Sequence, residues 1–507
     1  MAVNQLKAGA VLSYVLIGLN VLIGLLYTPF LLRMLGQSEY GLYSLAASVI
    51  AYLTVLDLGF GNAIIRYTAK FRAEGKTEEQ YEMFGMFFIL YLGISVIAFI
   101  IALTVAFNAD AIFSARMSVQ EVDKMRIILI LMAFNLAFTF PMSIWGSIIT
   151  AYENFVFQKI INIIRTLLNP LVMIVLLMMG YKAVALVVVT TCFNVATLVI
   201  HCIYCRRRLK IKLRFKRFNW SFLKEVSVYS FWVFLNAVTD QIYWSTGQMI
   251  LGIFQGAVPV AIYAVAIQLK NMYYMFSTAI GSVFLPRITA MVTKGASEQE
   301  VSDLFIRTGR VQYIIMAYIL TGFIVLGRPF VRLWAGVNYD QSYTIALLFF
   351  ITTFVPLIQN LGISILMARN ELKFRSILIV CASVASLLIA IPFSIWWGAI
   401  GCAIATSLAI IFAYGVGLNI YYKIKIHLDI KRFWREIGHM SIIPICIICI
   451  GVFIVRFVNI DNFGALVVAI IVLSIVYVPL FYRFAMNAYE RSLLINIMKK
   501  VSHSCGF

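Results

Sequence analysis

Residues 9–35 read GAVLSYVLIGLNVLIGLLYTPFLLRML, an apolar stretch in which Arg33 is the single charged residue. About 20 consecutive apolar residues are enough for an α-helix to cross the roughly 30 Å hydrocarbon core of a bilayer. The stretch is too long for a cleaved signal peptide and has no clear cleavage site. It therefore predicts a first membrane-spanning helix.

The rest of the chain repeats this pattern. The apolar residues Ala, Val, Ile, Leu, Met, Phe, Trp, Tyr and Cys make up 63% of the 507 residues, and charged residues make up 12%. Soluble domains are about 45–50% apolar and about 25% charged. The sequence therefore predicts an all-α polytopic membrane protein with about 14 transmembrane helices. The expected spans are 9–35, 40–66, 84–107, 126–150, 158–180, 183–204, 226–251, 259–285, 308–328, 342–367, 374–395, 398–421, 438–457 and 463–484.

The basic residues predict the orientation. If both termini are cytoplasmic, 32 of the 41 Lys and Arg fall in inner segments, 8 fall in outer segments and Lys270 lies inside a span. Such an excess marks the cytoplasmic side, so the net charge of +20 is a topology signal and not a sign of nucleic-acid binding. The outer basic residues are Arg33, Arg116, Lys124, Arg126, Lys182, Arg328, Arg332 and Arg456.

A weak internal repeat predicts the domain organisation. Residues 35–47 and 255–267 each join two spans, and an offset of 220 residues aligns Tyr43 with Tyr263. Six spans separate them, so both halves are expected to insert with the same orientation, as a parallel repeat. The predicted parts are an N-terminal six-helix bundle (1–205), a basic cytoplasmic linker (206–225), a C-terminal six-helix bundle (226–422), and two extra transmembrane helices with a cytoplasmic tail (423–507).

Motifs for catalysis, metals or nucleotides are absent from the sequence. Gly75-Lys76-Thr77 resembles the end of a phosphate-binding loop, but Lys70 stands where its leading glycine is needed. There is no HExxH, and the four histidines are scattered. The loops between spans are too short to carry a glycosyltransferase or polymerase site. We therefore expect no enzymatic activity and no cofactor.

Charges inside the predicted spans indicate function. A charge at mid-bilayer costs at least about 2.5–3.5 kcal/mol, so Asp57, Asp240 and Lys270 are expected to face a polar interior. Asp240 and Lys270 lie at similar depth on consecutive helices, roughly 18 Å from the turn that joins them. They form either a structural pair or a cavity that meets a solute or coupling ion. Asp57 is either an ion-coupling group or a hydrogen-bonding partner between helices.

The expected site has three parts, each with a competing interpretation. Arg33 is also a candidate for a snorkelling arginine at the interface. Arg66 and Arg287 end repeat-equivalent spans, so they are either a cytoplasmic gate or topology anchors. The predicted groups are a substrate cavity for pyrophosphate and glycan (Lys270, Arg33, Tyr274, Asn236 and Tyr243), ion coupling or helix pairing (Asp57 and Asp240), and the gate (Arg66 and Arg287).

The segment LRMLGQSEYGLY at 32–43, followed by LDLGFGNAIIRY at 56–67, resembles the polysaccharide transport family. That family includes flippases of O-antigen and capsule repeat units, and its superfamily also contains multidrug extruders and lipid II flippases. The resemblance implies alternating access between two bundles. It also implies export of undecaprenyl-pyrophosphate-linked oligosaccharide across the bacterial cytoplasmic (inner) membrane, for O-antigen, capsule or exopolysaccharide synthesis. Arg33 and Asp57 match positions of the family's motif, and the resemblance assigns no role to either.

Partners and alternatives follow from this resemblance. Membrane lipid would hold the prenyl tail, H⁺ or Na⁺ would be the coupling ion, and a polysaccharide polymerase and chain-length regulator are the candidate protein partners. One alternative is an ion-coupled multidrug antiporter of the same fold, but Lys270 and the arginines favour an anionic solute. Another is a non-transporting scaffold, which would not need polar intramembrane faces.

Overall fold

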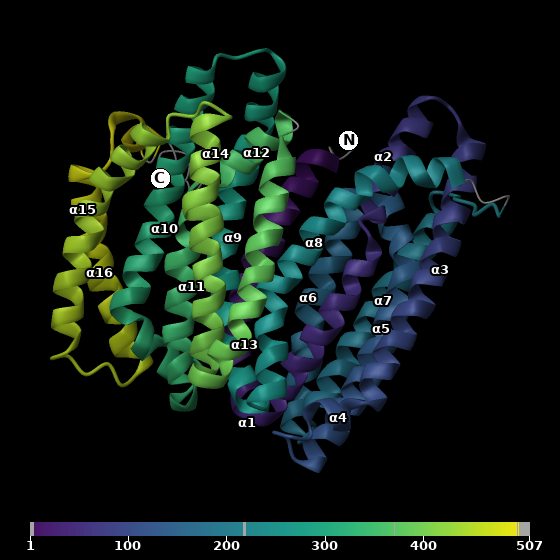
Figure 1. The fold of residues 1–507 in the computed structure, drawn as a ribbon, viewed down its shortest axis with the longest axis horizontal. Helices are drawn as coiled ribbons and strands as arrows, with labels where there is room; N and C mark the ends of the chain where they lie inside the picture. The colour runs from purple at the N-terminus through teal and green to yellow at the C-terminus, as the bar shows by residue number, and fades with distance from the viewer. Residues whose placement is uncertain (1–4, 216–219, 370, 494, 496–507) are drawn as a thin grey trace, which may run out of the picture. The chain divides into compact units, whose positions relative to one another are not determined.

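The computed structural model describes residues 5–215, 220–369, 371–493 and 495. All regular elements in these ranges are helical, as Figure 1 shows. Helices suit lipid because they satisfy their backbone hydrogen bonds within one segment. The α-helices are α1 (Gln5–Thr54), α2 (Phe60–Ala73), α3 (Thr77–Phe107), α4 (Ala109–Phe113), α5 (Val119–Ala151), α6 (Phe155–Met178), α7 (Ala183–Arg207), α8 (Trp220–Phe254), α9 (Ala257–Thr293), α10 (Glu298–Trp334), α11 (Asp340–Ile358), α12 (Asn360–Ala368), α13 (Leu372–Ile410), α14 (Leu418–Ile424), α15 (Ile430–Val455) and α16 (Phe463–Phe484). Three short helical segments are η1 (Val55–Asp57), η2 (Val337–Tyr339) and η3 (Ile411–Gly417).

The chain folds into two compact units. Unit 1 consists of Met1–Ala264 and Ile379–Thr406, and unit 2 of Val265–Leu378 and Ser407–Phe507. Helices α9 and α13 each pass from one unit into the other. The bundle limits expected from the sequence repeat stay a prediction.

The helices are long and apolar enough to cross a membrane. Ten such ranges occur in the described part of the chain. Two of them, Ala8–Ala73 and Leu372–Ile424, are far longer than one crossing needs. Each contains a glycine with non-helical backbone, at Gly36 (φ 75°) and Gly398 (φ 57°). The prediction of an all-α polytopic membrane protein is confirmed, and the number of about 14 spans stays a prediction.

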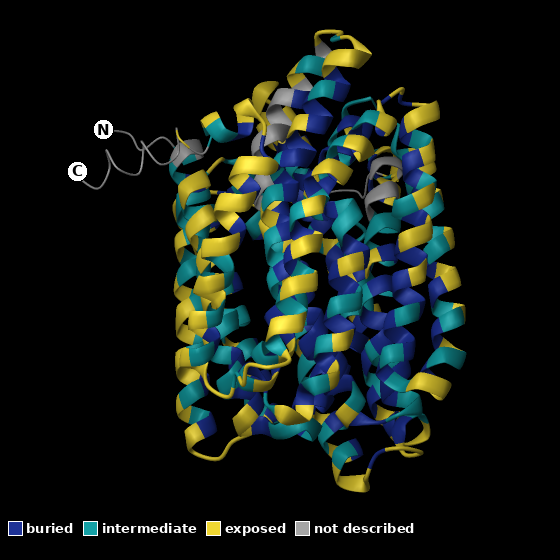
Figure 2. Ribbon diagram, turned by 90° about the vertical axis from the view of Figure 1, so that its left-hand side faces the viewer, coloured by how far each residue is buried: buried dark blue, intermediate teal, exposed yellow. Residues whose placement is uncertain are grey.

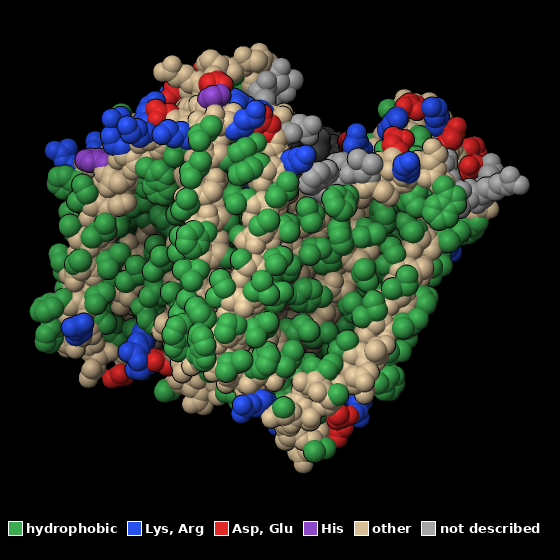
Figure 3. Space-filling view, viewed as in Figure 1, with side chains coloured by type: hydrophobic (Ala, Val, Ile, Leu, Met, Phe, Trp, Pro, Cys, Tyr) green, Lys and Arg blue, Asp and Glu red, His purple; other side chains and the backbone are tan. Residues whose placement is uncertain are grey.

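Large apolar side chains face outward in both units. Leu26 on α1 is 75% exposed and Ile475 on α16 is 65% exposed. Figure 2 shows that exposed residues continue along the middle of the helices, and Figure 3 shows hydrophobic side chains over the same middle region, with most Lys and Arg near the helix ends. Exposed apolar surface of this extent marks a lipid-facing protein.

The two glycines aligned by the sequence repeat both have a positive φ. Gly36 has φ 75° and Gly256 has φ 89°. Both values lie in the left-handed region that glycine enters without a steric cost. Gly36 joins the two halves of α1, and Gly256 joins α8 to α9. The repeat therefore places a glycine with positive φ at equivalent positions between consecutive helices.

The span expected at 40–66 is not one continuous helix. After α1 and η1, Leu58 (φ 52°) and Gly59 (φ 73°) take left-handed conformations before α2 begins at Phe60. Hydropathy missed this break because Leu56, Leu58 and Phe60 keep the segment apolar, while the break depends on backbone angles. Asp57 consequently lies at an interruption and not on a regular helical turn.

Replacing Gly59 with alanine is expected to lower the free energy of unfolding by about 1–2 kcal/mol, because a Cβ disfavours the left-handed region. Thermal unfolding of the purified protein in detergent measures this loss of stability. The matched control is Gly93→Ala in α3, where the added Cβ has open space. Equal losses for both variants would contradict a special role of the Gly59 backbone.

Candidate functional site

A cavity of about 430 Å³ with polar and apolar walls lies between α1 and α6 within unit 1. Its α6 wall is a stripe of residues spaced three or four apart, which share one helix face. The polar lining residues are Asn20 and Tyr27 on α1 and Asn162, Arg165, Thr166 and Asn169 on α6, with Leu16, Ile23 and Pro170 completing the wall. Carboxamides, hydroxyls and a guanidinium line this cavity, and no carboxylate does so.

Arg165 is the cation of this cavity. It lies ten residues into α6, roughly 15 Å from the helix start and near the middle of the helix. Its Nη1 donates to Asn194 Oδ1 at 3.1 Å, and Asn194 Nδ2 donates to Asn135 Oδ1 at 2.6 Å and to Thr139 Oγ1 at 2.8 Å. No carboxylate forms an ion pair with Arg165 among the described residues. Because a guanidinium carries five N–H donors, most of its hydrogen-bonding capacity is left for a bound anion.

The sequence reasoning missed Arg165 and Arg310. The count of basic residues assigned both to cytoplasmic segments, although they fall inside the predicted spans 158–180 and 308–328. The structure places them within α6 and α10. The inner count of 32 therefore included basic residues that lie inside predicted spans. A search for every charge inside a predicted span would have found both.

Asp57 lies at the helix break in unit 1. Tyr91 on α3, which is fully buried, donates its hydroxyl to Asp57 Oδ1 at 2.7 Å, and the Gly59 backbone N–H also bonds the carboxylate. The carboxylate thus stands before the N-terminus of α2, where the helix dipole favours negative charge. Interrupted helices of this kind hold coupling ions in many transporters. Ion coupling and helix pairing by Asp57 both stay predictions.

Lys270 and Tyr274 come together in unit 2, one turn apart on α9. Lys270 is buried, with 4% of its surface exposed, and its Nζ lies 5.7 Å from the centroid of the Tyr274 ring. Tyr274 is 37% exposed. The ring face supplies a cation–π contact for a buried ammonium.

The three predicted residues of α8 have different surroundings in unit 1. Asn236 is half-buried and Asp240 is exposed. Tyr243 is buried, and its hydroxyl donates to the Ile379 carbonyl at 3.5 Å. Asp240 and Lys270 belong to different units, so their predicted pairing stays a prediction.

The three predicted arginines lie within α1, α2 and α9. Arg33 is exposed on α1, shortly before the Gly36 turn. Arg66 is exposed on α2, with its Cζ 5.9 Å from the centroid of the Tyr67 ring. Arg287 belongs to α9, but its side chain lies outside the described residues. The predicted gate therefore stays a prediction.

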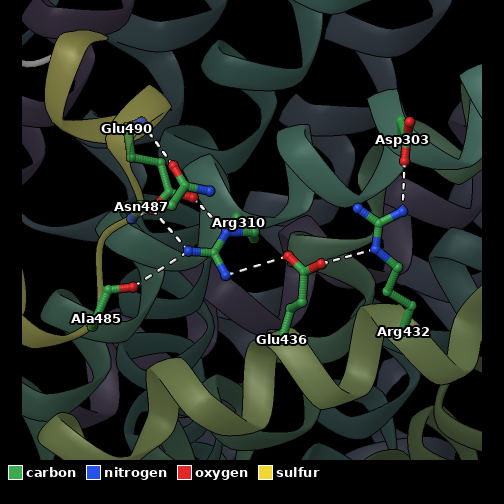
Figure 4. Close-up of polar contacts among 7 residues, drawn as sticks. All are labelled: Asp303, Arg310, Arg432, Glu436, Ala485, Asn487 and Glu490. Carbon is green, nitrogen blue, oxygen red and sulfur yellow. Dashed lines mark hydrogen bonds and ion pairs between the residues drawn. The ribbon is translucent and has the colours of Figure 1, made fainter.

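An ionic cluster within unit 2 joins α10 to α15 and to Glu490, which follows α16 (Figure 4). Buried Arg310 donates from Nε and Nη2 to the two carboxylate oxygens of buried Glu490, at 2.5 and 3.0 Å. Its Nη1 donates to Glu436 on α15 at 3.3 Å. Glu436 also accepts from Arg432, which pairs with Asp303 at 2.7 Å. Every group has a protein partner, so this cluster is an anchor for α15 and α16 and not a solute site.

The sequence matches a known family. Residues 6–292, more than half of the chain, match the family described as polysaccharide biosynthesis protein. The chain is 20% identical over 502 residues to "Uncharacterized membrane protein EpsK" of Bacillus subtilis (strain 168), covering 95% of this chain and 96% of that protein. It is 22% identical over 391 residues to "Putative O-antigen transporter" of Shigella flexneri, covering 75% and 89% of the two chains.

Solved structures share the fold. The lipid II flippase MurJ in an inward closed conformation superposes with a TM-score of 0.70 at 17% identity, covering 94% of this chain and 98% of that one. An inward-facing multidrug resistance transporter of the MATE family gives 0.65 at 15% identity, covering 82% and 95%. At these identities the likeness is one of fold.

Proposed function

The chain belongs to the polysaccharide biosynthesis protein family, within the superfamily of multidrug and polysaccharide exporters, and from this premise we propose that it is a flippase. Its substrate is an undecaprenyl-pyrophosphate-linked oligosaccharide repeat unit, moved from the inner to the outer leaflet of the bacterial cytoplasmic membrane. The product serves O-antigen, capsule or exopolysaccharide synthesis. The observation that carries this proposal is the intramembrane cavity of unit 1 with Arg165 in its wall.

The chemistry of the cavity suits such a substrate. A pyrophosphate is best held by a guanidinium, which donates two parallel hydrogen bonds to phosphate oxygens. Sugar hydroxyls both donate and accept, as do the carboxamides of Asn20, Asn162 and Asn169. The prenyl tail stays in lipid, which covers the apolar outer faces of the helices. Lys270, held over Tyr274, supplies a further cation, which is buried in unit 2.

The proposed cycle is alternating access, with both termini cytoplasmic. No nucleotide-binding motif occurs in the sequence, so an ion gradient, the membrane potential or mass action would drive transport. Asp57 and Asp240 are the proposed H⁺ or Na⁺ coupling groups. Arg33 is proposed to contact the anionic substrate, and Arg66 and Arg287 are proposed to form the cytoplasmic gate. A polymerase and a chain-length regulator are the proposed protein partners.

The same fold also serves multidrug transporters, which is the second candidate function. A cavity for cationic drugs is expected to carry carboxylates, whereas the residues that line the unit 1 cavity include Arg165 and no Asp or Glu. This difference favours an anionic solute. A non-transporting scaffold would have no use for a polar cavity in the membrane.

The test is depletion of the protein in its native bacterium. Prenyl-pyrophosphate glycans are extracted and measured by mass spectrometry, and their sidedness is determined in sealed vesicles. Accumulation of the complete repeat unit on the cytoplasmic leaflet is the expected result. Unchanged surface glycan without accumulation would exclude the flippase and direct the work to drug-efflux assays.

Replacing Lys270 with alanine is expected to reduce export about 10-fold, because a charge-assisted contact to phosphate is worth about 1.5–3 kcal/mol. Surface glycan per membrane-inserted protein is the measurement. Lys294→Ala, an exposed lysine beyond the end of α9, is the matched control and is expected to keep full export. Normal export by the Lys270 variant at normal protein level would remove Lys270 from the substrate path.

A further inference from the structure

Two cavities adjoin each other at one end of unit 2. The first, of about 490 Å³, is an apolar groove between α15 and α16 that reaches Val325 and Leu326 on α10. The second, of about 630 Å³, lies where α10 and α15 end and α16 has not yet begun. They share four lining residues, Val325, Val455, Val458 and Ile460. The groove therefore adjoins the second cavity along these residues.

The second cavity is basic. Three of its lining residues are Arg328, Arg332 and Arg456. Arg328 and Arg332 both pair with Asp340, at 2.8 and 2.5 Å. Arg456 is exposed and has no ion pair within the described ranges. With Asp461 also in the wall, three positive and two negative groups leave a formal charge of one positive unit, which complements one phosphodiester.

The groove has the dimensions of an acyl chain in one leaflet. Its α15 wall runs from Ile443 to Val455 and its α16 wall from Ala465 to Leu480, about 18 and 22 Å along the helix axes. Half of the hydrocarbon core is about 15 Å thick. Ala465 and Ala469 have small side chains, which leave room beside α16, whereas Val325 of α10 packs against Gly451.

We propose that this composite cavity is a binding site for an anionic glycerophospholipid. One acyl chain lies in the groove between α15 and α16, and the phosphodiester meets Arg456 beside the Arg328–Asp340–Arg332 cluster. Basic pockets between transmembrane helices on the cytoplasmic side of membranes hold anionic headgroups, and the same charge complementarity applies to this cavity. The inference is independent of the proposed transport function, because it concerns lipid retained by the resting protein. The predicted topology places this lipid in the outer leaflet.

Native mass spectrometry of the delipidated full-length protein tests the proposal, with phosphatidylglycerol and phosphatidylethanolamine of matched chains as probes. Wild type is expected to prefer phosphatidylglycerol. Arg456→Ala is expected to weaken its binding about 5-fold and Arg456→Glu about 25-fold, since each unit of charge near the surface contributes about 1 kcal/mol. The control for loss of a basic residue is Lys182→Ala, at the turn before α7 in unit 1. It is expected to leave phosphatidylglycerol binding unchanged.

A second pair of variants tests the groove. Val472→Trp fills it from an exposed position on α16 and is expected to reduce phosphatidylglycerol binding. Ile475→Trp, also at an exposed position on α16 but outside the groove, is expected to leave phosphatidylglycerol binding unchanged. Equal binding of both lipids, or binding unaffected by Arg456→Glu and Val472→Trp, would overturn the proposal. Stronger Arg456-dependent binding of undecaprenyl phosphate than of phosphatidylglycerol would also overturn it.

Discussion

Replacing Arg165 with alanine is expected to reduce export of the lipid-linked glycan at least about 10-fold while the protein still inserts and folds. Its guanidinium stands near mid-helix at a polar cavity, where hydrogen bonds between charged groups are worth about 1.5–3 kcal/mol. The measurement is accumulation of the repeat unit on the cytoplasmic leaflet, normalised to folded protein. Arg165→Lys is expected to recover part of the export, because it keeps the charge but loses the planar fork.

The competing explanation is that Arg165 only supports the hydrogen-bond chain through Asn194 to Asn135 and Thr139. Asn194→Ala separates the two roles, since it removes the centre of that chain and leaves the cation in place. A substrate-binding arginine predicts that Asn194→Ala keeps more export than Arg165→Ala at equal protein level. Equal defects, both matched by a loss of folded protein, would assign Arg165 a structural role.

Composition alone was enough to predict the fold class. Spans as apolar as 463–484 have no stable place outside a membrane, and their helical state follows from the lack of backbone partners in lipid. The turn glycines were also predictable in part. Gly36 and Gly256 stand at aligned positions between spans, and both adopt the left-handed backbone that glycine tolerates.

The features near the candidate site were harder to predict. Hydropathy does not predict the helix break after Asp57, because the residues around Gly59 are apolar and are therefore assigned to one continuous span. The partners of Asp57 and Arg165 are Tyr91 and Asn194, which lie 34 and 29 residues away along the chain. A single sequence gives no signal for pairings at such separations. Polar residues at helical spacing on α6 were visible in the sequence. The count of basic residues nevertheless assigned Arg165 to a cytoplasmic loop.

The link between α10 and the last two helices rests on residues even farther apart. Arg310 and Glu490 are 180 positions apart, and the second lies beyond the predicted span 463–484. The sequence therefore predicted an appended helix pair without predicting what attaches it. In the structure the attachment is ionic at one end of α10 and apolar at the other, where Val325, Leu326 and Leu466 form a buried cluster.

Replacing Glu490 with alanine is expected to destabilise unit 2 by about 3–5 kcal/mol, because it removes the bidentate partner of a buried guanidinium. Arg310 would keep Glu436 at 3.3 Å, but Glu436 is shared with Arg432. The measurement is unfolding of the purified protein in detergent, monitored by protease cleavage between α15 and α16. The control is Arg432→Ala, whose half-exposed pairs with Asp303 and Glu436 are each expected to contribute at most about 1 kcal/mol.

The double variant Arg310→Met with Glu490→Leu separates an ionic anchor from simple packing. Removing both partners of a buried pair and filling their volume with apolar side chains is often neutral or stabilising. The double variant is therefore expected to recover most of the stability that Glu490→Ala loses, and the coupling follows from a double-mutant cycle. If the double variant is as unstable as the single one, the anchor depends on the geometry around Ala485 and Asn487, and charge compensation between Arg310 and Glu490 is not its main cause.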